Sequence, residues 1–197
     1  TSCNEYKIGY ETLIDLPILI HPAINYRPPL LSNVDRNGKK RLLLFVGSVK
    51  EDKGTDFILS NSERLCKSFP GVDFVLHWNT NSPGSRDYVN AEPQLRKLVN
   101  LVNNFEVFFG TLSTEQYEQL FDSVQGVIAS YMPKKYKHKT SGVFWDILRR
   151  SYCNLLCSKG TWLERESNYM EECAYFFDYG DIAVSYTHLR AHETRHD

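Results

Sequence analysis

The chain has 197 residues and a net charge of −1, with 42% hydrophobic and 24% charged residues. These values are typical of a globular protein with one sizeable core. The charge balance gives no reason to expect nucleic acid or an acidic polymer as a partner. No run of residues is long and apolar enough to span a bilayer.

The cysteines favour free thiols in a reducing compartment. Their number is odd, and only Cys153 and Cys157 lie close together in the sequence. No histidine lies at a zinc-like spacing from that pair. We therefore expect buried thiols, no metal site and a cytoplasmic protein. The cysteines are Cys3, Cys66, Cys153, Cys157 and Cys173.

From Arg41 onward, short apolar runs alternate with helical patterns, which is typical of a parallel sheet covered by helices. The expected strands are 41–47, 72–78, 105–110, 126–129, 154–158 and 174–178. The expected helices are 55–69, 94–102, one that begins at Ser113, and 143–151. Ser113 and Gln116 form a capping-box pattern at the start of the third helix. About six strand–helix units predict an α/β fold, doubly wound and Rossmann-like, with helices on both faces of a parallel sheet.

The two ends of the chain do not follow this rhythm. Residues 16–30 contain four prolines and resemble an extended connector, so we expect 1–40 to hold the end of a preceding domain and a linker. A start without methionine agrees with a chain that continues upstream. The folded domain is expected over 41–183.

Residues 184–197 contain three of the six histidines, and a metal-binding tail is one interpretation of them. The segment VSYTHLRAHETRHD also resembles a translated sequencing-adapter read-through of the kind found in metagenomic reading frames. We favour the second interpretation and expect no function of this tail.

The loop expected after the first strand is chemically distinctive. Gly47 allows a sharp turn, and Lys53 would bring an ammonium group to the strand ends, where a phosphate would bind. The alternative is a solvated charged turn. The loop is neither a P-loop nor a GxGxxG turn, so the sequence does not support a nucleotide triphosphatase or a dehydrogenase.

The loop expected after the fourth strand, 131–142, carries four lysines and leads into a helix. Thr140 or Ser141 can cap that helix, and Gly142 leaves its first amides open to an anion. Asp146 lies one turn further along, where a carboxylate could accept hydrogen bonds from ribose hydroxyls. The alternative is a capped helix behind a basic, solvent-facing loop.

A third loop contains Gly110 and Leu112, which could hold a nucleobase by its edge and its ring. An ordinary strand-to-helix turn explains the same residues. His77, near the end of a strand, could act as a base, but a hydrogen-bonded core or loop role is favoured, and His21 is interpreted as part of the linker. The sequence shows no Ser-His-Asp set and no paired carboxylates at one site.

Together these segments resemble the C-terminal domain of GT-B glycosyltransferases of group 1 (family 4-like), over roughly Pro17 to Asp181. The match rests on Gly47 with Lys53-Gly54, then on the four segments EVFFGTLSTEQYEQLFDS, KTSGVFWDIL, NLLCSKG and AYFFDYGD. The family usually has arginine directly after the first-loop glycine, where this chain has Ser48, so Lys50 or Lys139 would replace that cation. Many members also have a glutamate where this chain has His138, and the chain resembles a variant branch with a Tyr…Thr-Ser-Gly loop.

The resemblance implies a site for a nucleotide-sugar donor, UDP- or GDP-linked, that needs no metal and no other cofactor. Lys53 would neutralise the diphosphate, amides from Ser141 to Val143 would hold the same group, and Asp146 would hold the ribose. The donor-binding residues expected in this way are Gly47, Ser48, Lys53, Gly110, Leu112, Lys139, Thr140, Ser141, Gly142, Val143 and Asp146.

Such enzymes transfer a sugar, here expected to be a hexose, to an acceptor hydroxyl, and the resemblance favours retention of stereochemistry. The acceptor, a saccharide or lipid-linked saccharide of polysaccharide or glycolipid synthesis, would bind a domain that this chain lacks. We expect weak donor binding without turnover, in the cytoplasm or at the inner face of the membrane. The alternatives are a nucleotide-sugar epimerase of GT-B architecture and a non-catalytic doubly wound interaction domain.

Overall fold

The computed structural model describes residues 40–148, 150, 153–167 and 174–180. The predicted connector, apart from Lys40, lies outside the described residues, as do His21, Cys3 and Cys173. The predicted tail over 184–197 lies outside them as well.

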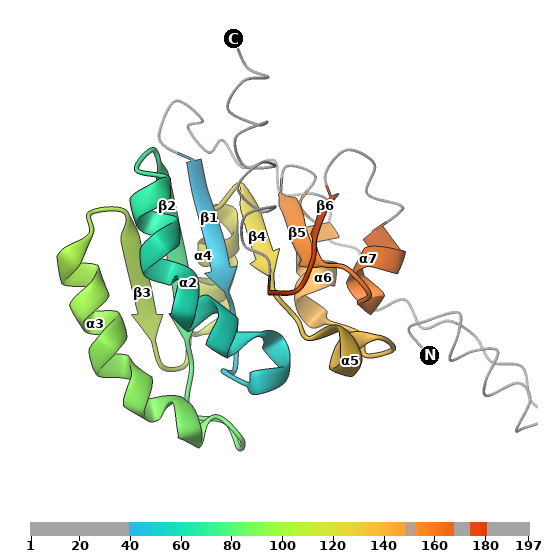
Figure 1. Cartoon of the computed structure of the whole chain (residues 1–197), viewed down its shortest axis with the longest axis horizontal. Helices are drawn as coiled ribbons and strands as arrows, with labels where there is room; N and C mark the ends of the chain where they lie inside the picture. Colours follow the sequence, from blue (N-terminus) through green and yellow to red (C-terminus); the bar gives the residue numbers. More distant parts are fainter. Residues whose placement is uncertain (1–39, 149, 151–152, 168–173, 181–197) are drawn as a thin grey trace, which may run out of the picture.

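Six parallel strands form one sheet in the order β3-β2-β1-β4-β5-β6, as the doubly wound prediction requires (Figure 1). The central strands are runs of apolar residues because both of their faces are covered. The strands are β1 (Lys40–Phe45), β2 (Val72–Trp78), β3 (Phe105–Phe109), β4 (Gly126–Ala129), β5 (Asn154–Ser158) and β6 (Ala174–Phe177).

Helices cover both faces of the sheet, which confirms that prediction: α2 and α3 lie in front of it in Figure 1, and α4 and α6 lie behind. The longer helices are α2 (Thr55–Ser68), α3 (Glu92–Leu101), α4 (Thr114–Asp122) and α6 (Gly142–Leu148). Shorter elements occupy the loops: η1 (Glu51–Lys53), η2 (Arg86–Ala91), α5 (Pro133–Tyr136) and α7 (Trp162–Glu166). The fourth helix was predicted to reach residue 151, but α6 ends at Leu148.

The core is split into two layers because successive side chains of a strand point to opposite faces. In β1, Leu42 and Leu44 join the layer under α2 and α3, whereas Leu43 joins the layer under α4 and α6. α2 contributes Ile58 and Leu65 to the first layer, at the spacing that keeps one face of a helix buried.

The start of α4 is the predicted capping box. The Ser113 hydroxyl accepts a hydrogen bond from the Gln116 amide at 3.1 Å, and the Gln116 side chain accepts one from the Ser113 amide at 2.9 Å. Of the apolar residues predicted to face the core, Leu120, Phe121 and Val124 are buried and Tyr117 is half-buried.

In the described part of the chain, no helix has the length and apolar character needed to cross a membrane.

Candidate functional site

The strand order reverses between β1 and β4. In an open parallel sheet, the loops that follow two such strands diverge and leave a crevice at the carboxyl edge, where ligands bind. The η1 turn follows β1 and α5 follows β4, and both lie at the lower edge of the sheet in Figure 1. Most of the predicted donor-binding residues belong to these two loops.

The loop after β1 folds back over its own first residue. Gly47 has φ of +94°, and a Cβ placed on it would lie 3.3 Å from the Lys53 ammonium nitrogen. The ammonium therefore lies beside the backbone at the end of β1. Ser48 pairs with Asn79, the residue that follows β2, in an isolated β-bridge.

Lys53 is half-buried, and its pKa is lowered from its ordinary value to about 8. Burial is the main cause, because removal from water disfavours the charged form. Asp52 raises the pKa, whereas Lys50 and Lys139 lower it further. A negative charge beside the ammonium would stabilise its charged form and raise this pKa.

The loops after β1 and β4 are packed directly against each other. A Cβ on Gly54, which has φ of +74°, would lie 1.7 Å from the Ser130 carbonyl oxygen, so this approach requires glycine. The Met132 amide donates a hydrogen bond to the Asp52 carbonyl at 3.0 Å. The Ser130 hydroxyl lies 3.4 Å from the Lys53 carbonyl oxygen, at the long end of hydrogen-bond distances.

Lys139 reaches across from the second loop to the first. Its ammonium lies 2.5 Å from the Asp52 carboxylate and 4.7 Å from the centre of the Tyr136 ring. Lys139, which was predicted to replace the arginine of the family, thus lies next to the first loop, with its charge balanced by Asp52. A ligand phosphate would have to compete with that carboxylate for it.

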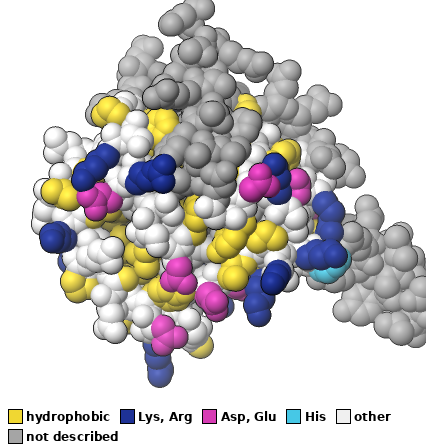
Figure 2. Space-filling view, viewed as in Figure 1, with side chains coloured by type: hydrophobic (Ala, Val, Ile, Leu, Met, Phe, Trp, Pro, Cys, Tyr) yellow, Lys and Arg dark blue, Asp and Glu magenta, His cyan; other side chains and the backbone are white. Residues whose placement is uncertain are grey.

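α5 presents its lysines outward. Tyr136 is buried and its ring lies 4.2 Å from that of Tyr131, centre to centre, which anchors the short helix. Lys134, Lys135 and Lys137 are exposed, and none of them forms an ion pair with a described residue. Figure 2 shows several basic side chains at the right-hand side of the view.

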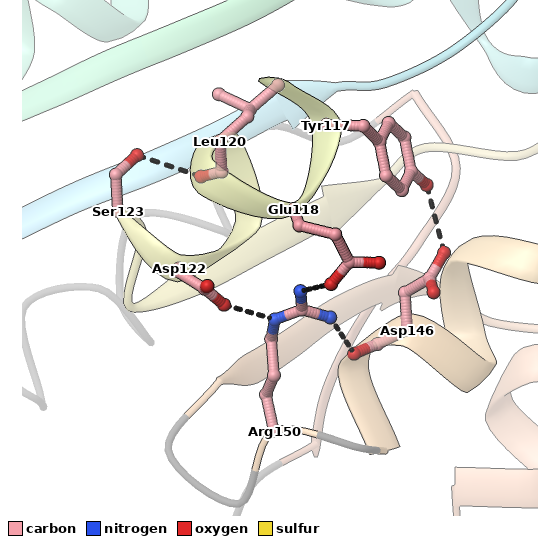
Figure 3. Close-up of polar contacts among 7 residues, drawn as sticks. All are labelled: Tyr117, Glu118, Leu120, Asp122, Ser123, Asp146 and Arg150. Atoms are coloured by element: carbon pink, nitrogen blue, oxygen red, sulfur yellow. Dashed lines mark hydrogen bonds and ion pairs between the residues drawn. The ribbon is translucent and has the colours of Figure 1, made fainter. Parts of the chain in front are cut away.

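Tyr131 and Tyr117 connect the second loop to the helix that carries the predicted ribose ligand. The Tyr131 hydroxyl lies 3.1 Å from that of Ser141, just before α6. The Tyr117 hydroxyl, from α4, donates a hydrogen bond of 2.9 Å to the Asp146 carboxylate (Figure 3). Burial raises the pKa of both tyrosines, and the Asp146 charge raises the pKa of Tyr117 further. Both hydroxyls therefore remain protonated.

The other predicted residues lie around the start of α6 and in the loop after β3. At the start of α6, Thr140 is half-buried, Gly142 is exposed and Val143 is buried. Gly110 has φ of +83°, and its amide donates to the Trp78 carbonyl at 2.9 Å. Leu112 is half-buried against the layer under α4 and α6.

His77 makes contacts that the sequence did not reveal. The favoured interpretation, a hydrogen-bonded core histidine, agrees with its 3% exposure. Its ring, however, bonds to Gly47 and to Gly110, two of the predicted site residues on different loops. The contacts of Asp52 and Tyr117 were also missed, because a charged turn and a helical stripe explain both residues without a site.

Among the described residues, no group of three or more His, Cys, Asp or Glu side chains could hold a metal ion. The described cysteines, Cys66, Cys153 and Cys157, are buried free thiols, as predicted for them. Burial raises the pKa of Cys66 to about 12, which makes its thiol unreactive.

No protein-family model and no curated protein matches the chain. Solved structures do. The C-terminal domain of a group 1 glycosyltransferase (LpcC) from Francisella tularensis superposes with a TM-score of 0.57 at 15% identity, covering 86% of this chain and 85% of that one. An α,α-trehalose-6-phosphate synthase from Burkholderia multivorans gives a TM-score of 0.60 at 12% identity, covering 80% of this chain and 35% of that one.

A UDP-forming synthase of the same type from Burkholderia xenovorans, in complex with glucose-6-phosphate, gives a TM-score of 0.60 at 12% identity over 79% of this chain and 36% of its own. This chain thus spans about a third of the length of these synthases. At such low identities the likeness concerns the fold. The chain has the fold of the C-terminal, Rossmann-like half of GT-B glycosyltransferases.

Proposed function

We propose that this chain is the donor-binding half of a glycosyltransferase, which holds a nucleotide sugar while the sugar is transferred to an acceptor hydroxyl. The observation that carries the proposal is the packing of the loops after β1 and β4 at the point where the strand order reverses, with the Lys53 ammonium beside Gly47. Ligand sites of open parallel sheets lie at such points. The GT-B fold supports the same conclusion.

The chemistry of the site suits a leaving diphosphate. Transfer of the sugar leaves additional negative charge on the nucleotide, and a cation fixed beside that charge lowers the barrier. The half-buried Lys53 would supply it, with Lys139 and the amides from Ser141 to Val143 as further ligands. Because lysines take this role, the proposed reaction needs no metal.

Asp146 would bind the ribose. Its carboxylate is oriented by the Tyr117 hydroxyl, and a carboxylate accepts hydrogen bonds from vicinal hydroxyls. Through Tyr131 and Ser141, this part of the site is continuous with the loop that carries Lys53. The alternative of an interaction domain requires these residues to be unrelated surface groups, so the continuity favours a ligand site.

Within this proposal the donor is a UDP- or GDP-hexose, and the acceptor is a saccharide or lipid-linked saccharide of polysaccharide or glycolipid synthesis. The acceptor would bind a second domain, as in whole GT-B enzymes, where the cleft between the domains holds both substrates. The chain alone is therefore expected to bind donor weakly and not to turn over. The enzyme would act in the cytoplasm or at the inner face of the membrane.

The proposal is tested by titrating the full chain with UDP, GDP and ADP in a thermal-shift experiment, confirmed by calorimetry. One nucleotide should stabilise the protein, by about 2.7 kcal/mol at a concentration one hundred times its dissociation constant. Lys53→Ala and Asp146→Ala should each weaken binding about tenfold, since each removes a charged hydrogen-bonding group.

Lys159→Ala is the matched control. Lys159 follows β5 at the same edge of the sheet, but its ammonium pairs at 3.0 Å with Asp178, a carboxylate that belongs to neither of the two packed loops. This variant should bind the nucleotide like the wild type. Binding that is unaffected by Lys53→Ala and Asp146→Ala would contradict the proposed site.

A further inference from the structure

His77 lies near the end of β2, the strand between β1 and β3, and its side chain contacts the loops that follow both neighbours. Its Nδ1 accepts a hydrogen bond from the Gly47 amide at 3.1 Å. Its Nε2 lies 2.8 Å from the Gly110 carbonyl oxygen. The buried ring of His77 thus connects the loop after β1, which would bind the diphosphate, with the loop after β3, which would bind the base.

The two partners determine the protonation of the ring. An amide N–H can only donate, so Nδ1 carries a lone pair; a carbonyl can only accept, so Nε2 carries the proton. The imidazole is therefore neutral. Burial lowers the pKa of His77, the Gly110 carbonyl opposes this effect, and the nearby charge of Lys53 lowers the pKa further. The neutral ring binds both loops while Lys53 remains the local cation.

Both partners are glycines in the left-handed region, with φ of +94° for Gly47 and +83° for Gly110. Glycine has no Cβ to restrict its peptide planes, so hydrogen bonds must fix their orientation. His77 supplies one bond to each. No other described residue is bonded to both glycines by a side chain.

We propose that His77 is a positioning residue that sets the spacing between the loop after β1 and the loop after β3, so that both loops can contact one nucleoside diphosphate. This inference rests on the proposed function. Gly47 and Lys53 would serve the diphosphate end of the ligand, and Gly110 and Leu112 the base end. His77 itself touches neither the ligand nor the reacting atoms.

Two conservative substitutions separate the two bonds. The amide oxygen of asparagine can occupy the place of Nδ1, so His77→Asn keeps an acceptor for Gly47 and loses Gly110. The amide nitrogen of glutamine can occupy the place of Nε2, so His77→Gln keeps a donor for Gly110 and loses Gly47. His77→Ala loses both bonds. Each variant of the full chain is titrated with pyrophosphate and with UDP, GDP and ADP.

His77→Gln should weaken pyrophosphate binding about tenfold, because the Gly47 amide is no longer fixed. His77→Asn should bind pyrophosphate like the wild type. Its affinity for the nucleoside diphosphate should be about tenfold lower than that of the wild type, because the base side is no longer fixed. His77→Ala should show both losses. Equal effects of the Asn and Gln variants on both ligands, or no effect of any variant, would overturn the proposal.

Asn104→Ala controls for a general loss of stability. Asn104 is also a buried polar side chain, and its amide donates to the carbonyls of Cys66, Phe69 and Val72 at 2.9 to 3.0 Å, before β3 at the opposite edge of the sheet. It should destabilise the fold without changing affinity for either ligand. A matching affinity loss in Asn104→Ala would assign the His77 effects to stability and overturn the proposal.

A readout without ligand separates this inference from the proposed function. Exchange of the Gly47 amide proton, followed by NMR, should accelerate in His77→Gln and stay slow in His77→Asn, whereas the Gly110 carbonyl ¹³C shift should move only in His77→Asn and His77→Ala. If the wild type binds no nucleotide but these signals behave as stated, the donor-site proposal is wrong. The inference that His77 connects the two loops is then still supported. Unchanged signals would overturn the connection itself.

Discussion

Burial lowers the pKa of the Lys53 ammonium, and the charges of Lys50 and Lys139 lower it further. The folded protein therefore holds this proton less tightly than the unfolded chain does. The sequence pointed to Lys53 and Gly47 through their spacing, but it did not show that the side chain folds back over the glycine. That return depends on η1, a turn of three residues.

The lowered pKa of Lys53 predicts a specific dependence of stability on pH. Between about pH 8 and pH 10 the unfolded chain keeps the Lys53 proton and the folded protein releases it, so the contribution of Lys53 to the free energy of unfolding should rise with pH in this window. Lys53→Met should lack this rise. Urea unfolding of both proteins at pH 7, 8, 9 and 10 measures the difference.

Subtraction of the variant removes the contributions of the buried thiols and tyrosines, which both proteins share. Their pKa values are raised above 10, so their effect has the opposite sign and begins at higher pH. If the curves of the two proteins stay parallel from pH 7 to 10, the Lys53 ammonium is not buried as described.

Between elements, α4 and α6 are joined by a buried charge. The Arg150 side chain is 1% exposed and bonds to Glu118 at 2.5 Å and to Asp122 at 2.9 Å, both on α4 (Figure 3). It also donates to the Asp146 carbonyl of α6 at 2.9 Å. The same pair of helices carries the bond from Tyr117 to Asp146, so the position of the proposed ribose ligand depends on this junction.

Arg150→Met should lower the free energy of unfolding by about 3 kcal/mol, because it removes one partner of a buried ion pair and leaves two carboxylates close together. Chemical denaturation measures this loss. Arg41→Met is the matched control, because the pair of Arg41 with Glu106 is more exposed and should contribute less than about 1 kcal/mol. Similar losses in the two variants would show that burial of Arg150 contributes nothing.

Elements with a strong periodic pattern could be predicted, and short ones could not. The capping box at Ser113 and the apolar runs of β2, β4 and β5 were found with their correct bounds, because each has a pattern of its own. α5 and α7 have four and five residues, too few for a helical period to appear. Within α5 the proline and lysines resemble a loop.

At the scale of the whole molecule, the apolar pattern indicated two covered faces but not which strands are neighbours. Alternation tells which face a side chain occupies, whereas the order β3-β2-β1-β4-β5-β6 depends on contacts between distant residues. The position of the reversal, and with it the packing of Gly54 against Ser130, therefore came only from the structure. His77 is a further example, because its partners are 30 and 33 residues away.

Gly54→Ala tests whether this packing joins the two halves of the sheet. The new methyl group would meet the Ser130 backbone and would require a left-handed conformation, so the two loops must separate. We expect a loss of more than about 3 kcal/mol in the free energy of unfolding, together with loss of nucleotide binding. Gly84→Ala, also at positive φ but with nothing within 4 Å, isolates the conformational cost. Equal losses would exclude a role of the contact.

The central position of β1 has a consequence for the order of folding. β1 pairs on one edge with β2, which follows it after a single helical crossover. Its other edge pairs with β4, which comes much later in the chain. The hydrogen bond from the Arg41 amide to the Gln125 side chain, for example, spans 84 residues. Closing so long an excursion is entropically unfavourable and slow. Until it closes, β1 exposes a row of unpaired backbone groups, so a newly made chain is most prone to aggregate through this strand.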